Sequence, residues 1–300
     1  MHVPRPLASA PVLLGASTLL WAGHWIVARG VREEFSATTL AFWRWAVATL
    51  VLLAVAGQGL YRKRAELRGS WLHLAFFGIT GTSIYSILAY RGIQETSASN
   101  ALLLQAITPA LIPVFAWLIF GERVRAHAVI GVAVSFLGIL AIVTRMDPLV
   151  LATLSFDHGD LWILGSVALW ALYTACLRLR PAGLTELEFL LAIALVGLVP
   201  MTPFYLAEIA SGAGGLRLRP DVIFAVFYVA VVLSVINYAI WGLGVKAIGS
   251  TATGIYLNMV PPVGIIMAVL ILGETPRPYH ALGFFLTLAG VWLASRRPTR

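Results

Sequence analysis

Aromatic and hydrogen-bonding side chains recur at the same spacing inside the apolar stretches of this chain. Trp21 and His24 are three residues apart, as are Trp170 and Tyr173, so each pair would place a ring and a polar tip on one helix face. Such rings pack against the apolar part of a ligand, while the polar tips hold its polar end. The pattern predicts non-covalent binding of a small amphipathic molecule.

More residues of these types occupy equivalent positions when the chain is compared with itself. The equivalent pairs are Trp21 and Trp170, His24 and Tyr173, Tyr85 and Asn237, Ser86 and Tyr238, Leu104 and Tyr256, and Gln105 and Leu257, with Asn258 one position later. Polar side chains facing lipid cost about 1 to 3 kcal/mol each, so mid-helix ones should face protein or a water-filled cavity. We expect ligand contacts from Trp21, His24, Tyr85, Gln105, Trp170, Tyr173, Asn237, Tyr238, Tyr256 and Asn258. The alternative is that the tryptophans and tyrosines are interfacial or helix-packing groups.

Catalytic constellations are missing from the apolar stretches, which hold no carboxylate pair, histidine cluster or Ser–His arrangement. The single cysteine, Cys176, cannot form an intramolecular disulfide and has no partner at a zinc-ligand spacing. The sequence also lacks a Gly-x4-Gly-Lys-Ser/Thr loop, which excludes the use of ATP unless a partner supplies it. We expect no enzyme activity, no metal and no cofactor.

Composition identifies the surroundings of the chain as lipid. Hydrophobic residues make up 60% and charged residues 11%, with a mean hydropathy of +0.89, whereas ordinary soluble domains carry about 25% charge. A helix of about 20 apolar residues crosses a hydrocarbon core about 30 Å thick, and a barrel strand would instead alternate apolar and polar residues. The sequence predicts an all-α integral membrane protein with ten transmembrane helices, near 7–28, 38–57, 70–90, 97–119, 126–144, 159–178, 187–208, 221–242, 250–272 and 279–295.

Basic residues set the expected orientation, because Lys and Arg accumulate in the cytoplasmic loops of membrane proteins. With the N-terminus inside, the inner segments hold thirteen: Arg5, Arg62, Lys63, Arg64, Arg68, Arg123, Arg125, Arg178, Arg180, Lys246, Arg296, Arg297 and Arg300. The outer segments hold seven: Arg29, Arg32, Arg91, Arg145, Arg217, Arg219 and Arg277. Both termini are therefore predicted to be cytoplasmic. This orientation next to an anionic inner leaflet accounts for the net charge of +8, so no nucleic acid partner is needed.

The chain contains a weak internal repeat. At a shift of 152 residues, Gly92, Pro109, Gly121, Glu122, Gly131 and Gly138 match Gly244, Pro261, Gly273, Glu274, Gly283 and Gly290. Each half, 1–148 and 152–300, holds five of the expected helices, and an odd number of crossings inverts the second copy. Inverted repeats place a binding site near the membrane midplane between the halves, so we expect one domain built from two repeats. The repeated glycine pairs could pack helices within one subunit or between two, which leaves the oligomeric state open.

Residues of the fourth and ninth stretches resemble a known family. Ser97 to Val124, with Ala98, Ala101, Pro109 and the closing Gly121-Glu122-Arg123, is similar to the fourth helix of the EamA branch of the drug/metabolite transporters, and Gly249 to Thr275 looks like its duplicate. The resemblance implies ten helices in two inverted repeats, location in a bacterial inner membrane, and export of small metabolites. Trp170 and Tyr173 in a Trp-Ala-x-Tyr run make the chain similar to exporters of aromatic and hydrophobic amino acids within that family. Export of a sugar or drug-like compound is the alternative, and a channel is a more remote one.

Charged and bending residues give expectations about mechanism. Arg44 lies about 9 Å into its helix at 1.5 Å per residue, and we favour an interpretation in which its side chain reaches the outer headgroups. The alternative is that Arg44 faces the cavity and attracts a ligand carboxylate. Asp and Glu occur only at the ends of the ten stretches, which favours facilitated diffusion, or coupling through His24. Pro109 and Pro261 lie inside matched helices and should kink them, so we expect hinges there.

Overall fold

Helices form the framework of this computed structural model, which describes residues 10–30, 36–96, 98–122, 125–147, 149–152, 157–212, 215, 219–272 and 277–295. Within these ranges there is no strand, and each of the ten apolar stretches is mainly helical where it is described. Six stretches are single helices: α1 (Ala10–Gly30), α2 (Ala37–Arg62), α8 (Ala126–Thr144), α10 (His158–Cys176), α11 (Glu186–Ala210) and α16 (Pro278–Ser295). Short helices α3 (Arg64–Gly69), α9 (Leu149–Ala152) and η2 (Leu177–Leu179) lie outside or at the ends of these stretches.

The other four stretches change helix type in the middle. The third contains α4 (Trp71–Gly78), the π-helix η1 (Ile79–Ser83) and α5 (Ile84–Glu95), and the eighth contains α12 (Pro220–Phe227), the π-helix η3 (Tyr228–Asn237) and α13 (Tyr238–Ile248). The fourth is α6 (Ala98–Gln105) followed by α7 (Thr108–Phe120), and the ninth is α14 (Ser250–Gly254), the 3-10 helix η4 (Ile255–Met259) and α15 (Val260–Leu272). The 152-residue shift maps one interruption onto the other in each pair, so both halves are interrupted at equivalent sequence positions.

Seven helical segments of the described chain are long and apolar enough to cross a membrane. They are Ala37–Arg62, Trp71–Glu95, Leu103–Phe120, Ala126–Thr144, His158–Leu179, Glu186–Ala210 and Pro220–Ile248, and Pro278–Ala294 is a shorter apolar helix. The basic residues Arg5, Arg123 and Arg296, among others used to predict the orientation, lie outside the described residues, as do Gly273 and Glu274 of the repeat.

Capping residues define several helix ends. The Ser36 hydroxyl accepts a hydrogen bond from the Thr39 amide at 3.0 Å and starts α2. Thr185 and Glu188 form a capping box at the start of α11, in which each side chain accepts from the backbone of the other. Gly121 ends α7 with a φ of +67°, a left-handed conformation that glycine adopts at little cost.

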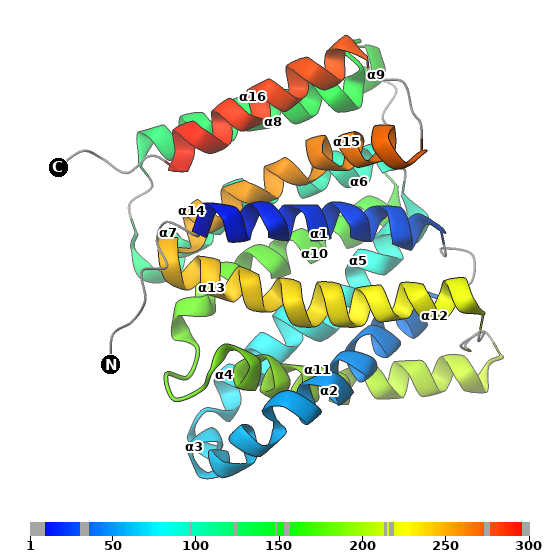
Figure 1. Ribbon diagram of the computed structural model, residues 1–300, viewed down its shortest axis with the longest axis vertical. Helices are drawn as coiled ribbons and strands as arrows, with labels where there is room; N and C mark the ends of the chain where they lie inside the picture. Colours follow the sequence, from blue (N-terminus) through cyan, green and yellow to red (C-terminus); the bar gives the residue numbers. More distant parts are fainter. Residues whose placement is uncertain are drawn as a thin grey trace.

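The main helix contacts join the first half of the chain to the second. In Figure 1, α2 lies along α11 at the bottom of the bundle and α8 lies along α16 at the top. Between them, α1 packs against α13 and α15, while α10 packs against α5 and α7. Each half therefore contributes one helix, α1 or α10, to the interior of the other half's bundle.

The α8–α16 crossing uses the repeated glycines. A Cβ added to Gly131 would lie 2.5 Å from the Gly290 carbonyl oxygen, and one added to Gly138 would lie 2.7 Å from the Gly283 carbonyl oxygen. Side chains larger than glycine would separate the two backbones, so these four glycines permit a close helix contact within one subunit.

Candidate ligand-binding site

A cavity of about 80 Å³ lies between the two halves, at the level where the third, fourth, eighth and ninth stretches change helix type. Six residues expected from the sequence to contact a ligand or act as a hinge line it: Trp21, His24, Tyr85, Gln105, Trp170 and, at its α15 side, Pro261. The cavity is smaller than the ~300 to 1,000 Å³ of sites that enclose drug-sized ligands.

Aromatic rings form the walls of the cavity. The ring centroids of Trp21 and Trp170 are 5.5 Å apart in an edge-to-face arrangement, and those of Tyr85 and Trp170 are 5.1 Å apart. Tyr173 stacks on Trp170 from behind, with centroids 5.1 Å apart and an interplanar angle of 29°. This packing holds the Trp170 ring in place, so its face is preorganised for an apolar ligand group.

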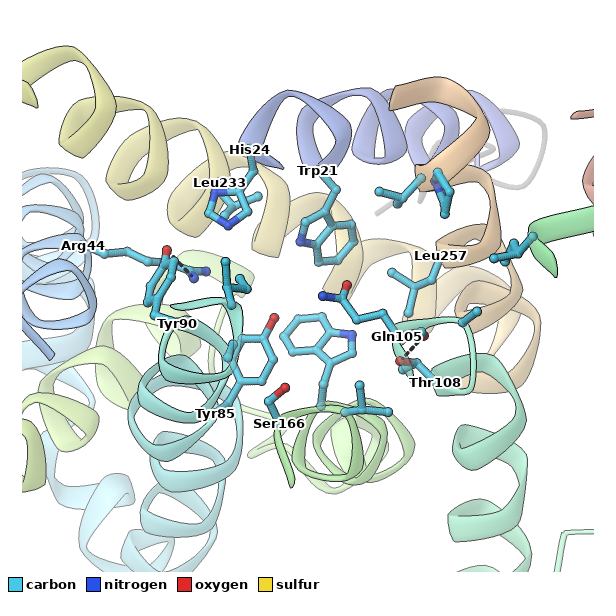
Figure 2. A pocket seen from close by; sticks show the side chains of 18 residues that line it. Trp21, His24, Arg44, Tyr85, Tyr90, Gln105, Thr108, Ser166, Leu233 and Leu257 are labelled. Carbon is cyan, nitrogen blue, oxygen red and sulfur yellow. Dashed lines mark hydrogen bonds between the residues drawn. The ribbon is translucent and has the colours of Figure 1, made fainter. Parts of the chain in front are cut away.

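Arg44 lies at one side of the cavity, next to Tyr90 and below His24 in the view of Figure 2. Its side chain is buried, with only 3% exposure, and its Nε donates to the Ser234 hydroxyl at 2.6 Å while Nη1 donates to the Tyr90 hydroxyl at 3.3 Å. The favoured interpretation from the sequence, that Arg44 reaches the outer headgroups, is wrong. Arg44 shares the buried face of α2 with Ala41 and Ala48, and that face packs against η3 and α5, so the side chain points inward.

The amide of Gln105 points into the cavity from the side opposite Arg44 (Figure 2). Gln105 ends α6, and its backbone oxygen accepts from the Thr108 hydroxyl at 2.7 Å across the Ala106–Ile107 turn. Among the residues that the structure describes, neither the Gln105 amide nor the Tyr85 hydroxyl has a protein hydrogen-bond partner. Both groups are available to a ligand.

Tyr173, Tyr238 and Asn237 lie outside the cavity lining. Tyr238 is buried, donates its hydroxyl hydrogen to the Gly81 carbonyl oxygen at 2.8 Å, and accepts from Arg44 Nη2 at 3.5 Å. The side chain of Asn237 is fully buried, and neither its oxygen nor its nitrogen has a hydrogen-bond partner in the described part of the chain. These residues surround the site and hold its lining, and they do not contact the cavity in this conformation.

Tyr256 and Asn258 lie further away. Tyr256 lines a separate groove of about 250 Å³ between α1, η4 and α16, and Asn258 donates to the Ser135 hydroxyl of α8. The prolines expected to act as hinges both follow a break in their stretch. Pro109 is the second residue of α7, after the Ala106–Ile107 turn, and Pro261 is the second residue of α15, after the 3-10 helix.

Sequence reasoning missed part of the lining, including Tyr90 and Leu233. Tyr90 is five residues after Tyr85, a spacing that does not repeat on an α-helical face. Leu233 lies within η3, where the π-helix shifts the residues that face inward. The run Thr80-Gly81-Thr82-Ser83 was the available signal of an irregular helix, because hydroxyl side chains bond to nearby carbonyls and disturb helices. In the structure, Thr80 donates to the Phe76 oxygen at 2.7 Å and Ser83 donates to the Gly78 oxygen at 3.2 Å.

Comparison with known proteins identifies the class of this fold. The chain matches the EamA-like transporter family twice, over residues 9–144 and 157–296. It belongs to the EamA-like transporter family. The cavity of this EamA-like transporter lies between the two matched segments, since Trp21 and Tyr85 come from the first and Trp170 from the second.

Relatives of this EamA-like transporter match nearly its whole length. An uncharacterized transporter of Archaeoglobus fulgidus is 28% identical over 299 residues, which cover 95% of this chain and 97% of the relative. A probable terminal-alkyne amino-acid exporter of Streptantibioticus cattleyicolor is 28% identical over 301 residues, covering 97% and 95%. A solved crystal structure that is 19% identical has a TM-score of 0.77 and covers 96% of each chain, so it shares the fold. The protein is thus a multi-pass membrane transporter.

Proposed function

We propose that this transporter exports aromatic and hydrophobic amino acids by alternating access at the central cavity. The observation that carries the proposal is the cavity itself, in which aromatic faces lie between the Arg44 guanidinium on one side and the Gln105 amide on the other. An amino acid has an apolar side chain for the rings and, next to each other on one carbon, a carboxylate and an ammonium for polar contacts. The name of the Streptantibioticus relative, a probable terminal-alkyne amino-acid exporter, supports an amino acid as the class of substrate.

The proposed membrane arrangement is ten crossings in a bacterial inner membrane, with both termini in the cytoplasm. Residues 1–148 and 152–300 form two inverted five-helix repeats of one domain. The start of α1 and the end of α16 at the same end of the bundle support an even number of crossings (Figure 1). The excess of basic residues in the segments assigned to that end supports its cytoplasmic location. In this arrangement the protein is a carrier without enzyme activity or cofactor.

Ion pairs between the halves would close the cytoplasmic end. Lys63, after α2, pairs with Glu188 of α11 at 2.6 Å, and Arg178, after α10, pairs with Glu122 at the end of α7. At the other end, the buried Asp160 accepts from the Asn100 amide at 3.0 Å and from the Thr96 hydroxyl, which again joins the two halves. We infer that transport opens these two sets of contacts in turn, with the helix breaks before Pro109 and Pro261 as hinges.

The driving force follows from the charges around the cavity. Within the described lining there is no Asp or Glu, and the alternative expected from the sequence is coupling through His24, which lines the cavity. Export down the substrate gradient needs no proton, so facilitated diffusion is the simpler mechanism. Coupling through His24 would make the export rate depend on a pH gradient.

Uptake of labelled compounds into proteoliposomes tests the proposal. We expect flux of Trp, Phe and Met above that of Thr, and no flux of a sugar or a nucleoside. The expected flux is the same with and without a pH gradient if diffusion is facilitated. Failure of every amino acid under any gradient, with flux of the sugar or nucleoside, would assign the cavity to another metabolite class.

The hinges are tested in the same assay. Pro109→Ala and Pro261→Ala each restore a backbone amide at a break and should slow transport while leaving folding intact; Pro109→Ala should also leave ligand affinity intact, because Pro109 does not line the cavity. Full flux in both well-folded variants would rule out the hinge role.

A further inference from the structure

The cavity contains a buried cation without an acidic partner. Arg44 is 3% exposed, and its partners are the hydroxyls of Ser234, Tyr90 and Tyr238, at 2.6, 3.3 and 3.5 Å. Across the described chain, no carboxylate forms an ion pair with Arg44 and none lines the cavity. Its guanidinium carbon also lies 5.3 Å from the centre of the Trp45 ring. All of these contacts are to neutral groups.

A charged side chain is costly to bury inside a protein unless an opposite charge accompanies it. Neutral hydroxyls and aromatic faces offset part of that cost. A guanidinium has five N–H donors, and the three hydrogen bonds of Arg44 leave donors for an additional acceptor. A planar carboxylate on the ligand would complete the site, because it can accept two of these hydrogen bonds side by side.

The hydroxyls near Arg44 are arranged to donate as well. The Tyr90 oxygen accepts from Arg44, so its own hydrogen can point to a ligand. The Tyr85 hydroxyl, which also lines the cavity, has no protein partner among the described residues. His24 faces the same space, with its ring 5.9 Å from that of Tyr90. This side of the cavity therefore presents a cation and hydrogen-bond donors, which suit an anion.

The same groups offer little to a substrate ammonium. In an amino acid the ammonium lies next to the carboxylate, so it would stand near Arg44 and His24, where the described lining has no acid to pair with it. The neutral Gln105 amide lies on the opposite side.

We infer that the cavity recognises its substrate by a carboxylate bound to Arg44, and that it does not require the α-ammonium group. The substrate class is then a compact monocarboxylate with an aromatic or aliphatic apolar part, including acids that lack an amine. The inference rests on the proposed function for the location of the substrate, and it narrows what that substrate must carry.

Four ligands test the carboxylate requirement in the wild-type protein. They are L-phenylalanine and three compounds that each change one group of it: 3-phenylpropionate lacks the ammonium, L-phenylalaninamide lacks the carboxylate charge, and phenethylamine lacks the carboxylate. Apparent affinities are measured by thermal stabilisation of the purified transporter. The two carboxylates should bind comparably, and the two amines at least tenfold more weakly. Equal binding of phenethylamine would overturn the carboxylate requirement, and loss of 3-phenylpropionate alone would show that the ammonium has a site of its own.

Arg44→Gln should weaken both carboxylates by about tenfold to a hundredfold, the range for hydrogen bonds to a charged group, and leave the amines unchanged. Arg44→Lys keeps the charge but loses the planar pair of donors, and its effect should be intermediate. Arg62→Gln is the matched control, since Arg62 ends the same helix and is exposed. If Arg44→Gln does not fold, the wild-type ligand series still decides.

The two hypotheses fail differently. If none of the four ligands binds while a sugar or nucleoside is transported, the proposed function is wrong. If L-phenylalanine is transported but the carboxylates and amines bind alike, the proposed function stands and the role of Arg44 is wrong.

Discussion

Removing the Lys63–Glu188 ion pair should open the end of the transporter that we propose to be cytoplasmic. Glu188→Gln keeps the size of the side chain and most of the α11 capping box, and it removes the charge that pairs with Lys63 at 2.6 Å. Because this pair joins the two halves, it stabilises only the state in which that end is closed.

The expected increase in the open fraction follows from the burial of the Lys63–Glu188 pair. The Glu188 side chain is 9% exposed and that of Lys63 is 30% exposed, so solvent screens the contact only in part. Hydrogen bonds between charged groups contribute about 1.5 to 3 kcal/mol, and partial exposure lowers this to about 1 to 2 kcal/mol. At 1.4 kcal/mol per factor of ten, the open fraction should rise about 5- to 30-fold. Glu122→Gln should do less, because both side chains of the Arg178–Glu122 pair are about half exposed, at 55% and 45%.

Cys176 is a built-in reporter of this opening. It is the single cysteine of the chain, it is 3% exposed near the end of α10, and it packs in the same buried cluster as Leu60 and Leu184. When opening and closing are fast, its rate of labelling by a maleimide follows the population of the open state. We expect faster labelling in Glu188→Gln, and no further increase when Lys63→Met is added, because both changes remove the same contact.

Asp221→Asn is the control, since the exposed Arg219–Asp221 pair lies at the start of α12, at the opposite end of the bundle from α3. Unchanged labelling in a stable Glu188→Gln protein would refute the reasoning. So would an equal increase in Asp221→Asn, because the effect would then not be specific to the end that holds the Lys63–Glu188 pair.

Three other changes have defined outcomes. Trp170→Leu removes an aromatic wall and should weaken the binding of L-phenylalanine at least tenfold in a titration, whereas Trp292→Leu, at a side chain 59% exposed, should not. Gly81→Ala would place a methyl group 2.3 Å from the Tyr173 ring and should lower the stability by about 1 to 3 kcal/mol in thermal unfolding, while Gly57→Ala, with its nearest contact at 3.7 Å, should be tolerated. Asp160→Asn replaces a buried acceptor with an amide and should lower the unfolding temperature; an unchanged value would mean that its contacts to the first half contribute nothing.

The positions of helices could be predicted from the sequence where polar residues mark both ends of an apolar run. The stretch 126–144 is helical over the same residues in the structure, because polar residues bound it on both sides. The π-helices η1 and η3 could not be located from hydropathy, since a π-turn leaves the apolar character of the run unchanged. They depend on local carbonyl contacts such as that of the Ser234 hydroxyl with the Val229 oxygen at 2.8 Å.

Internal symmetry selected some residues that line the cavity and others that lie away from it. Trp21 and Trp170 line the cavity together because α1 and α10 are equivalent helices that each enter the opposite half. Leu104 and Tyr256 are equivalent in sequence, yet Tyr256 faces a groove toward α16 because η4 has 3-10 geometry and rotates its residues. The inward direction of the Arg44 side chain could not be predicted without knowing which helices cover α2. These are η3 and α5, which lie far from Arg44 in the sequence.

Counterflow in proteoliposomes tests most directly that substrate crosses the membrane through the cavity between the halves. Vesicles loaded with unlabelled L-phenylalanine should accumulate labelled L-phenylalanine transiently, and excess 3-phenylpropionate outside should compete, because a carrier exchanges ligands at one site. Arg44→Gln should reduce the exchange, while Arg62→Gln should retain it. Flux of L-phenylalanine without stimulation by substrate on the opposite side would indicate a channel and contradict the account, as would full exchange in a protein carrying both Trp170→Leu and Arg44→Gln.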